Sequence, residues 1–395
     1  MKKLLITSFD MEVGGVERSL LSMLNNFDYQ QFDVDLLLYS HSGDFLSLLP
    51  PEAKLLDEIK EYRTVRKSIK DIFTDNMWFI AGARLLAKLR TLVCQAQEKD
   101  YLQAQFIWRY CLPFFPKVSQ EYDVAISYLW PHNFVADKVK AKLKIAWIHT
   151  DYSAITTNIQ MDLSVWETFD YIVSISADCT QAFVNKYPSL QHKLILVENL
   201  TSPEFIKAQS LDKFDPKIFC RSHFNLLSVG RLCHAKGFDL AIQALSLIHQ
   251  QGYTNIRWYV IGYGPDETQL KALIAQYKLE DNFILLGKIN NPYPYMKSCD
   301  LYLQPSRYEG KAVTISEAKI LAKAILVTNY PTAKSQIDHD IDGVICPSST
   351  EAIAQHIIDL AENPAKISAL SEYCQHQNYA NNEELQTLYQ VIKNT

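Results

Sequence analysis

Short apolar runs alternate with helical runs along nearly the whole chain. In the first half the apolar runs are KLLITSF, FDVDLLLY, YDVAISYL, LKIAWIHT, YIVSIS and KLILVEN. In the second half they are FNLLSVG, IRWYVIG, NFILLGK, DLYLQPS, AILVTNY and GVICP. Helical runs such as VERSLLSMLNNF and DLAIQALSLIHQ lie between several of them. Continuous apolar strands separated by helices predict an α/β fold with parallel sheets covered on both faces.

The length of 395 residues is too great for one ordinary core and predicts two domains. We expect one Rossmann-like domain over 1–205 and a second over 206–380, joined near 201–217, with a further helix over 381–395. Ligands in such sheets bind beyond the carboxyl ends of the strands. The two domains are therefore expected to face each other across a ligand-binding cleft.

Composition narrows the class of protein. Hydrophobic residues make up 48% of the chain and charged residues 21%, which is typical of a globular protein. A net charge of −5 argues against a general nucleic-acid binder. The 8 cysteines show no CxxC spacing, so we expect reduced core residues in a cytoplasmic protein. The apolar start of MKKLLITSFD is too short for a signal peptide, and no run approaches the ~18 apolar residues of a membrane span.

The stretch QPSRYEGKAVTISE, residues 304–317, follows one of the apolar runs and holds two carboxylates, Glu309 and Glu317. If a helix begins near Lys311, Glu309 precedes it and Glu317 lies about two turns inside it. Helix N-termini carry unpaired N–H groups and partial positive charge, which suit a phosphate. The pair could bracket a phosphorylated ligand, with one acid facing a sugar and the other a ribose. The alternative is that both are solvated residues around a helix cap.

Three further loops follow apolar runs. VGRLCHAKGFD carries Arg231 and Lys236, and WYVIGYGP turns at Gly262. Near the N-terminus, LLITSFDMEVGGVERSL places Gly14 and Gly15 between a strand and a helix. Because carboxyl ends of parallel strands share one edge of a sheet, these loops are expected to contribute to ligand sites.

Three motifs taken together resemble the retaining family-4 glycosyltransferases of GT-B fold (glycosyl transferases group 1), of the bacterial capsule and exopolysaccharide type. They are the Glu–seven residues–Glu signature after PS, the GRL–KG loop and the GG-V-E-R loop. The resemblance covers nearly the whole chain and is strongest from about 225 to 346. It implies metal-independent transfer, without a cofactor, from a nucleotide sugar to a glycan or lipid-linked acceptor in cell-surface polysaccharide biosynthesis. UDP-type donors are the commonest in this family and are favoured here.

The resemblance also assigns roles. It places Glu309 and His149 against the reacting sugar, Arg231 and Lys236 on the donor pyrophosphate, and Glu317 on the ribose. Further donor contacts are expected from Gly15, Gly262, Gly310 and the backbone N–H groups of Lys311, Ala312 and Val313. Acceptor contacts are expected from Gly14 and Arg18.

Plainer interpretations stay open for several of these residues. His149 could be a capping or core histidine, Arg231 part of a surface ion pair, and Lys236 a solvated loop lysine. Asp-x-Asp triplets at Asp33, Asp338 and Asp340 are interpreted as strand and turn residues, so no metal site is predicted. Where many relatives have a glycine-rich loop ending in Glu, this chain has NYPTAKSQI, which leaves the sugar and the base open.

An insertion at about 55–120 reads as helical and basic. Residues 60–117 contain eleven Lys or Arg against five Asp or Glu, with many aromatic residues between them. Such a composition suits contact with an anionic membrane at the inner face of the cell membrane, and with a lipid-linked phosphate. The alternative is a helical pair packed on the sheet with a solvated basic face.

Other functions on the same fold are a nucleotide-sugar epimerase, a phosphorylase with a lysine-bound pyridoxal cofactor, and a non-catalytic nucleotide-sugar-binding subunit. The resemblance further implies that the segment 381–395 crosses back onto the first domain.

Overall fold

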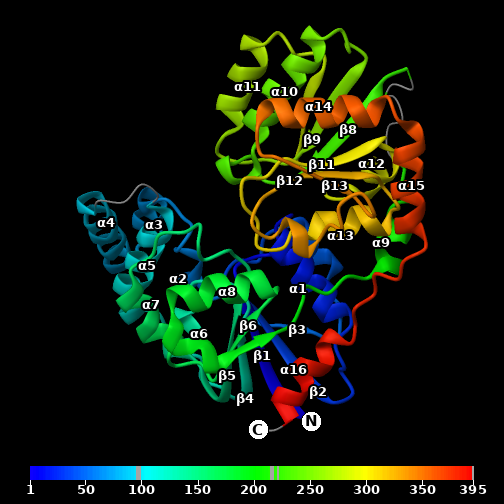
Figure 1. The fold of residues 1–395 in the computed structure, drawn as a ribbon. Coiled ribbons are helices and arrows are strands. Elements are labelled where there is room, and N and C mark those ends of the chain that lie inside the picture. Colours follow the sequence, from blue (N-terminus) through cyan, green and yellow to red (C-terminus); the bar gives the residue numbers. More distant parts are fainter. Residues whose placement is uncertain (95–98, 214–217, 220–221, 394–395) are drawn as a thin grey trace. The chain divides into compact units, whose positions relative to one another are not determined.

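The computed structural model describes residues 1–94, 99–213, 218–219 and 222–393 (Figure 1). The end of the predicted linker at 201–217, the last two residues of the predicted C-terminal helix, and Cys220 lie outside the described residues. The chain divides into two compact units. Unit 1 comprises Met1–Glu12, Val16–Glu198 and Asn382–Thr395, and unit 2 comprises Val13–Gly15 and Asn199–Asn381.

Unit 1 is built on a parallel sheet with strand order β3-β2-β1-β4-β5-β6-β7. Its strands are β1 (Lys2–Ser8), β2 (Phe32–Leu38), β3 (Lys54–Leu55), β4 (Glu121–Ser127), β5 (Lys140–Ile148), β6 (Tyr171–Ser174) and β7 (Leu194–Leu196). Its helices are α1 (Gly15–Asn25), α2 (Lys60–Arg63), α3 (Ile69–Thr74), α4 (Trp78–Val93), α5 (Asp100–Cys111), α6 (Asn133–Lys138), α7 (Ile159–Trp166), α8 (Ala177–Lys186) and α16 (Glu384–Lys393).

Unit 2 has a parallel sheet with strand order β10-β9-β8-β11-β12-β13. Its strands are β8 (Phe224–Val229), β9 (Ile256–Ile261), β10 (Phe283–Gly287), β11 (Leu301–Gln304), β12 (Ile325–Thr328) and β13 (Val344–Cys346). Its helices are α9 (Pro203–Gln209), α10 (Phe238–Gln250), α11 (Glu267–Gln276), α12 (Tyr293–Ser298), α13 (Val313–Ile320), α14 (Thr350–Ala361) and α15 (Pro364–Gln375).

The order in unit 2 is that of a Rossmann-like sheet, and it reverses between β8 and β11. Strand residues alternate between two cores, since Leu226 packs on one face of the sheet and Leu227 on the other. Helices therefore cover both faces, and the loops after β8 and β11 flank the switch point at which ligands bind in such folds. The predicted fold class, two parallel α/β units, is confirmed.

The C-terminal helix α16 packs within unit 1. The ring of Tyr389 lies 5.3 Å from that of Phe27 and 5.1 Å from that of Phe32, and its hydroxyl accepts from the amide of Asp28 at 2.8 Å. The Lys2 ammonium donates to the Ile392 carbonyl at 2.8 Å. The last described residues thus close the core of the unit in which the chain begins.

The insertion of unit 1 consists of α2, α3, α4 and α5. Four of its aromatic side chains, which composition alone suggested for a membrane surface, are core residues: Tyr62, Phe106, Trp108 and Phe115. They pack beneath the loop that follows β1 and β2, where Tyr39 lies 5.6 Å from Trp108. No helix in the described part of the chain has both the length and the apolar character that crossing a membrane requires.

His132 gives unit 1 a testable pH dependence. Its Nδ1 lies 2.7 Å from Ser127 Oγ, its ring is 4.5 Å from Trp166, and it is 1% exposed. Burial lowers the pKa of His132 from 6.5 to about 3, and the neighbouring His149 contributes. The unfolded chain therefore takes up a proton below pH 6.5 that the folded chain resists down to about pH 3.

We expect stability to fall as the pH drops below 6.5, by about 2 kcal/mol from this group at pH 5. Denaturant unfolding at pH 8 and pH 5 measures it. His132→Gln keeps a polar partner for Ser127 and should lose that part of the pH dependence, whatever it costs at pH 8. An unchanged difference between the two pH values in the variant would show that His132 is not the titrating group.

Candidate functional site

Three loops of unit 2 meet at the carboxyl ends of β8, β9 and β11. A Cβ atom at Gly262 would lie 1.9 Å from the Gly230 carbonyl oxygen, and one at Gly237 would lie 2.0 Å from that of Pro305. Gly237 also has a positive φ of 67°, which favours glycine. These glycines therefore allow the loops 230–237, 262–264 and 305–312 to touch through their backbones.

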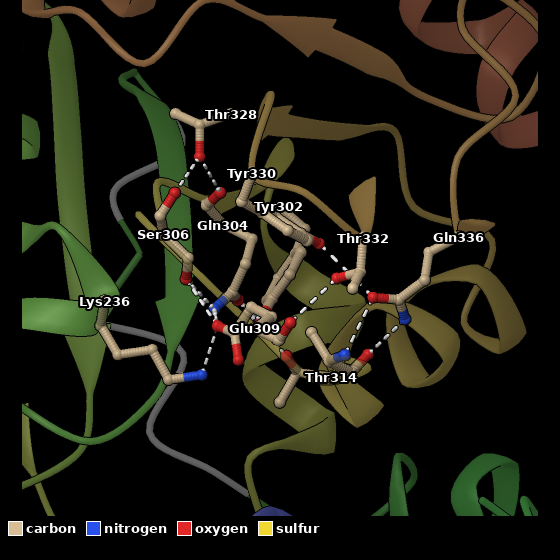
Figure 2. A network of polar contacts seen from close by, with 11 residues as sticks. Lys236, Tyr302, Gln304, Ser306, Glu309, Thr314, Thr328, Tyr330, Thr332 and Gln336 are labelled. Atoms are coloured by element: carbon tan, nitrogen blue, oxygen red, sulfur yellow. Dashed lines mark hydrogen bonds and ion pairs between the residues drawn. The ribbon is translucent and has the colours of Figure 1, made fainter. Parts of the chain in front are cut away.

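Glu309 is the centre of the polar network in these loops (Figure 2). Its Oε1 accepts from Lys236 Nζ at 2.5 Å, Ser306 Oγ at 2.6 Å and Gln304 Nε2 at 2.8 Å. The Glu309 side chain is 11% exposed and that of Lys236 20%. The other carboxylate oxygen, Oε2, has no hydrogen-bond partner among the residues that the structure describes. One oxygen fixes the carboxylate while the second is left for a ligand.

The orientation of Gln304 follows from its own neighbours. Its Oε1 accepts from the hydroxyls of Tyr302 at 2.9 Å and Thr314 at 3.3 Å. An amide whose oxygen receives two donors must direct its nitrogen the other way, here toward Ser306 and Glu309. From the sequence, Gln304 and Ser306 are predicted only as the end of a strand. The signal in the sequence was a pair of polar residues, Gln304 and Ser306, at the end of an apolar run. Both are buried, and buried polar side chains need hydrogen-bond partners.

The loop 305–312 is fixed to the loop after β8. Arg307 forms a two-pronged ion pair with Asp239, at 2.7 and 2.6 Å, and its amide donates to the Ala235 carbonyl at 2.7 Å. Because planar double contacts of this kind set direction as well as distance, they hold Lys236 and Glu309 in register. Sequence reasoning missed both Arg307 and Asp239.

The helix after Glu309 starts later than the sequence suggested. α13 begins at Val313 rather than near Lys311, so Glu317 lies about one turn inside it. The Ala312 amide donates to Gln336 Oε1 at 2.9 Å, which takes up one of the three backbone donors expected to face a phosphate. Gly310 and Lys311 belong to the loop before the helix. Glu317 is 1% exposed, and its Oε1 accepts from the Tyr293 hydroxyl at 2.9 Å.

The segment NYPTAKSQI, which departs from the family pattern, supports the loop that carries Glu309. Thr332 Oγ1 donates to the Glu309 carbonyl at 3.0 Å, and Gln336 Nε2 donates to that of Ala312 at 2.9 Å. A buried ion pair between Lys319 and Asp342 lies behind it, where Lys319 also donates to the Gln336 carbonyl.

The Asp-x-Asp residues near this segment have structural partners. Asp342 pairs with Lys319, and Asp340 pairs with Lys366 at 2.7 Å. In unit 1, Asp35 accepts from the Tyr122 hydroxyl at 2.9 Å within the sheet. The interpretation of these acids as strand and turn residues agrees with their contacts.

Arg231 stands apart from this network. It is exposed, and within the described residues the structure gives it no hydrogen bond or ion pair. It lies two residues after β8, in the loop that also holds Lys236. An exposed guanidinium at a sheet's switch point can bind an anion without breaking an existing pair.

The remaining predicted residues belong to other parts of the chain. His149 follows β5 of unit 1, its ring lies 4.7 Å from that of Tyr128, and burial lowers its pKa to about 3, so it is neutral. Arg18 is 7% exposed in α1 and lies 5.7 Å above the ring of Phe45. Gly14 and Gly15 precede and open α1 and are grouped with unit 2.

Two acidic residues, Asp10 and Glu17, follow β1 in unit 1 and form a second cluster of carboxylates. Burial raises the pKa of Glu17 from 4.5 to about 7, and the charge of Asp10 adds to the rise. Asp10 is 4% exposed and forms an ion pair with Arg66 of the insertion. A carboxyl group with such a pKa exchanges protons near neutral pH. Sequence reasoning gave no role to these three residues.

Comparison with known proteins bears on the fold and on the class of enzyme. Residues 219–377 match the family described as glycosyl transferases group 1. The amylovoran biosynthesis glycosyltransferase AmsK of Erwinia amylovora is 26% identical over 60% of this chain and 66% of its own length. The chain matches less than half, 46%, of the related AmsD. An uncharacterized glycosyltransferase of Haemophilus influenzae is 22% identical over 91% of this chain and 90% of its own.

A shorter match, 31% identical over 29% of this chain and 30% of the relative, is to a Campylobacter jejuni enzyme. That enzyme is named N-acetylgalactosamine-N,N'-diacetylbacillosaminyl-diphospho-undecaprenol 4-alpha-N-acetylgalactosaminyltransferase. The crystal structure of Anabaena Alr3699/HepE in complex with UDP-glucose superimposes with a TM-score of 0.72 at 15% identity, over 100% of both chains. The structural likeness confirms the GT-B fold, and the family and named relatives support a glycosyltransferase enzyme.

Proposed function

We propose that this chain is a retaining, metal-independent family-4 glycosyltransferase. It moves a sugar from a UDP-type donor to a glycan or lipid-linked acceptor in the biosynthesis of a capsule or other exopolysaccharide. The observation that carries the proposal is the Lys236–Glu309 pair, held by Gln304 and Ser306 at the switch point of unit 2. Relatives named for amylovoran and colanic acid biosynthesis favour the pathway class, and HepE structures with UDP and UDP-glucose favour the donor class.

In this proposal, Lys236 and Arg231 neutralise the diphosphate as negative charge develops on it. Lys236 is held by its ion pair with Glu309 and is 20% exposed, so it needs little reorganisation to stabilise this charge, whereas the exposed guanidinium of Arg231 is free to move onto a phosphate. The first amides of α13 add to this anion site, because a helix start lacks carbonyl partners for its N–H groups. These groups supply the charge compensation that a divalent ion gives in other transferases.

Glu309 binds the donor sugar. With Oε1 fixed by three donors, Oε2 faces the ring and accepts from its hydroxyls. The acceptor oxygen forms its bond to the anomeric carbon on the face from which the diphosphate departs. The acceptor proton passes to the departing phosphate oxygen, so the anomeric configuration is retained.

Glu317 is proposed to bind the ribose hydroxyls, sharing its carboxylate with the Tyr293 hydroxyl. Neutral His149 is proposed to contact the sugar from unit 1, and Gly14 and Arg18 to serve the acceptor. The protein is proposed to act in the cytoplasm at the inner face of the cell membrane. The epimerase and the non-catalytic subunit are not favoured, because the named relatives are transferases.

The proposal predicts turnover by the isolated chain without added metal. Purified protein is incubated in EDTA with a panel of UDP- and GDP-sugars, and nucleotide release is measured with water and with glycan or lipid-linked acceptors. NMR of the product then gives the anomeric configuration. We expect one UDP-sugar to be consumed with retention. An inverted product, or turnover that requires a divalent ion, would contradict the mechanism.

A further inference from the structure

Helix α4 of the insertion exposes most of its large apolar residues, with Ile80 buried, and buries all three of its alanines. Its buried residues include Ala81, Ala83, Ala87 and Thr91, and the helix packs against α5. Its exposed residues are Trp78 (63%), Phe79 (78%), Leu85 (50%), Leu86 (52%), Leu89 (52%), Leu92 (64%) and Val93 (79%). At 100° per residue these seven fall within one arc of about 140°, away from Ala83, Ala87 and Thr91, with Ala81 at the edge of that arc. A surface helix ordinarily does the reverse.

The apolar face of α4 extends onto its neighbours. Phe73 of α3 is 56% exposed and stacks on Trp78 at 6.3 Å, with 18° between the rings. Phe114, 45% exposed, stacks on Phe79 at 5.8 Å and 15°. Single exposed apolar residues are ordinary, but a continuous patch of this kind marks an interaction surface. Figure 1 shows α4 on the far side of α5 from the strands of unit 1.

The charged residues that α4 itself places at the borders of this face are positive, whereas α3, which adds Phe73, carries exposed Asp71 and is followed by exposed Asp75. Helical spacing places exposed Lys88 at one border and exposed Arg90 at the other, and α4 contains no acidic residue. The third cation, Arg84, is directed inward and donates to the carbonyls of Thr64 and Val65. Cations flanking an apolar stripe with tryptophan and phenylalanine match a bilayer surface, with phosphates at the level of the cations and acyl chains beneath.

A second copy of the chain fits this face less well. In a two-fold dimer the same patch meets itself, so Lys88 and Arg90 would approach the same cations of the other copy. No acid on α4 is present to meet them. An anionic lipid surface satisfies the apolar stripe and both of its borders at once.

We propose that the apolar face of α4, together with Phe73 and Phe114, inserts into the interfacial region of an anionic lipid bilayer. The helix lies along the surface, with Lys88 and Arg90 on lipid phosphates. The four core aromatic residues of the insertion, Tyr62, Phe106, Trp108 and Phe115, do not take part, because they are buried in the core of unit 1. For the proposed function, which this inference extends, the face brings the chain to the surface where a lipid-linked acceptor resides.

The test is flotation of the full chain with vesicles of phosphatidylglycerol and phosphatidylcholine (1:3), compared with phosphatidylcholine alone. We expect wild-type protein to float with the anionic vesicles. Leu86→Glu with Leu89→Glu should reduce binding at least tenfold, because both side chains are 52% exposed and contribute little to folding. The matched control, Leu211→Glu with Ile341→Glu, adds the same charge at sites 73% and 49% exposed in unit 2 and should float normally.

Lys88→Ser with Arg90→Ser should remove the preference for anionic vesicles. Failure of the wild type to bind vesicles, or equal binding by Leu86→Glu with Leu89→Glu, would overturn the inference. The inference would also be overturned if the wild type bound no vesicles and formed a dimer in light scattering, and if Leu86→Glu with Leu89→Glu dissociated that dimer. UDP-sugar hydrolysis measured without vesicles should be the same in Leu86→Glu with Leu89→Glu as in the wild type. If the wild type binds vesicles but hydrolyses no UDP-sugar, the result counts against the proposed function and not against this inference.

Discussion

Replacing Glu309 by glutamine is expected to lower kcat/KM for sugar transfer by about a hundredfold to a thousandfold. The substitution keeps the shape of the side chain and an oxygen that can accept from Gln304 and Ser306. It removes the negative charge that pairs with Lys236 and that is proposed to face the sugar. The loss should therefore fall on the reaction rather than on the fold.

Two measurements separate these effects. The denaturation midpoint of Glu309→Gln should stay within a few degrees of the wild type, because its loop is also held by Arg307 and Thr332. Glu280→Gln, an exposed carboxylate of unit 2, provides the matched control and should retain full activity. Turnover by Glu309→Gln within threefold of the wild type would remove Glu309 from the site.

Replacing Lys236 by alanine is expected to weaken UDP binding by about 10- to 100-fold and to slow transfer further. A hydrogen bond between charged groups contributes about 1.5–3 kcal/mol when one of its partners is a ligand phosphate. The change also leaves the Glu309 carboxylate, 11% exposed, without its cation. That unpaired charge would repel the incoming diphosphate.

Lys236→Arg is the matched variant because it keeps the charge and changes only the geometry. It should recover part of the UDP affinity but less of the rate, since the guanidinium presents its donors differently from an ammonium. Arg231→Ala should also weaken UDP binding, with no effect on stability, since Arg231 is exposed. Equal UDP affinity in Lys236→Ala and wild type, measured by calorimetry, would exclude Lys236 from the diphosphate site.

The strands of both units could be predicted because each is a continuous apolar run. All twelve predicted runs contain strands of the structure, whereas the two-residue β3 was missed because it is too short to form a pattern. The start of α13 was misplaced by about one half turn. Nothing near Ala312 in the sequence shows that a side chain 24 positions later, Gln336, binds its amide and its carbonyl.

The motifs of the site could be predicted one by one, but the hydrogen bonds and the ion pair that join them could not. Lys236 and Glu309 are 73 positions apart, and sequence spacing carries no information on whether their side chains meet. The insertion shows the same limit. Its basic and aromatic composition indicated a surface, but Trp108 is buried and the leucines of α4 are exposed. Only the packing of α4 on α5 determines which face is left outside.

The central claim is that the loops of unit 2 bind a nucleoside diphosphate through Arg231, Lys236 and the start of α13, without a divalent ion. Its most direct test is a titration of the wild-type protein with UDP in EDTA, followed by calorimetry and by thermal unfolding. The account predicts saturable binding and, at about 100 times the dissociation constant, about 2.7 kcal/mol of added stability. Absence of both heat and stabilisation with UDP and GDP, or binding that appears only after a divalent ion is added, would contradict it.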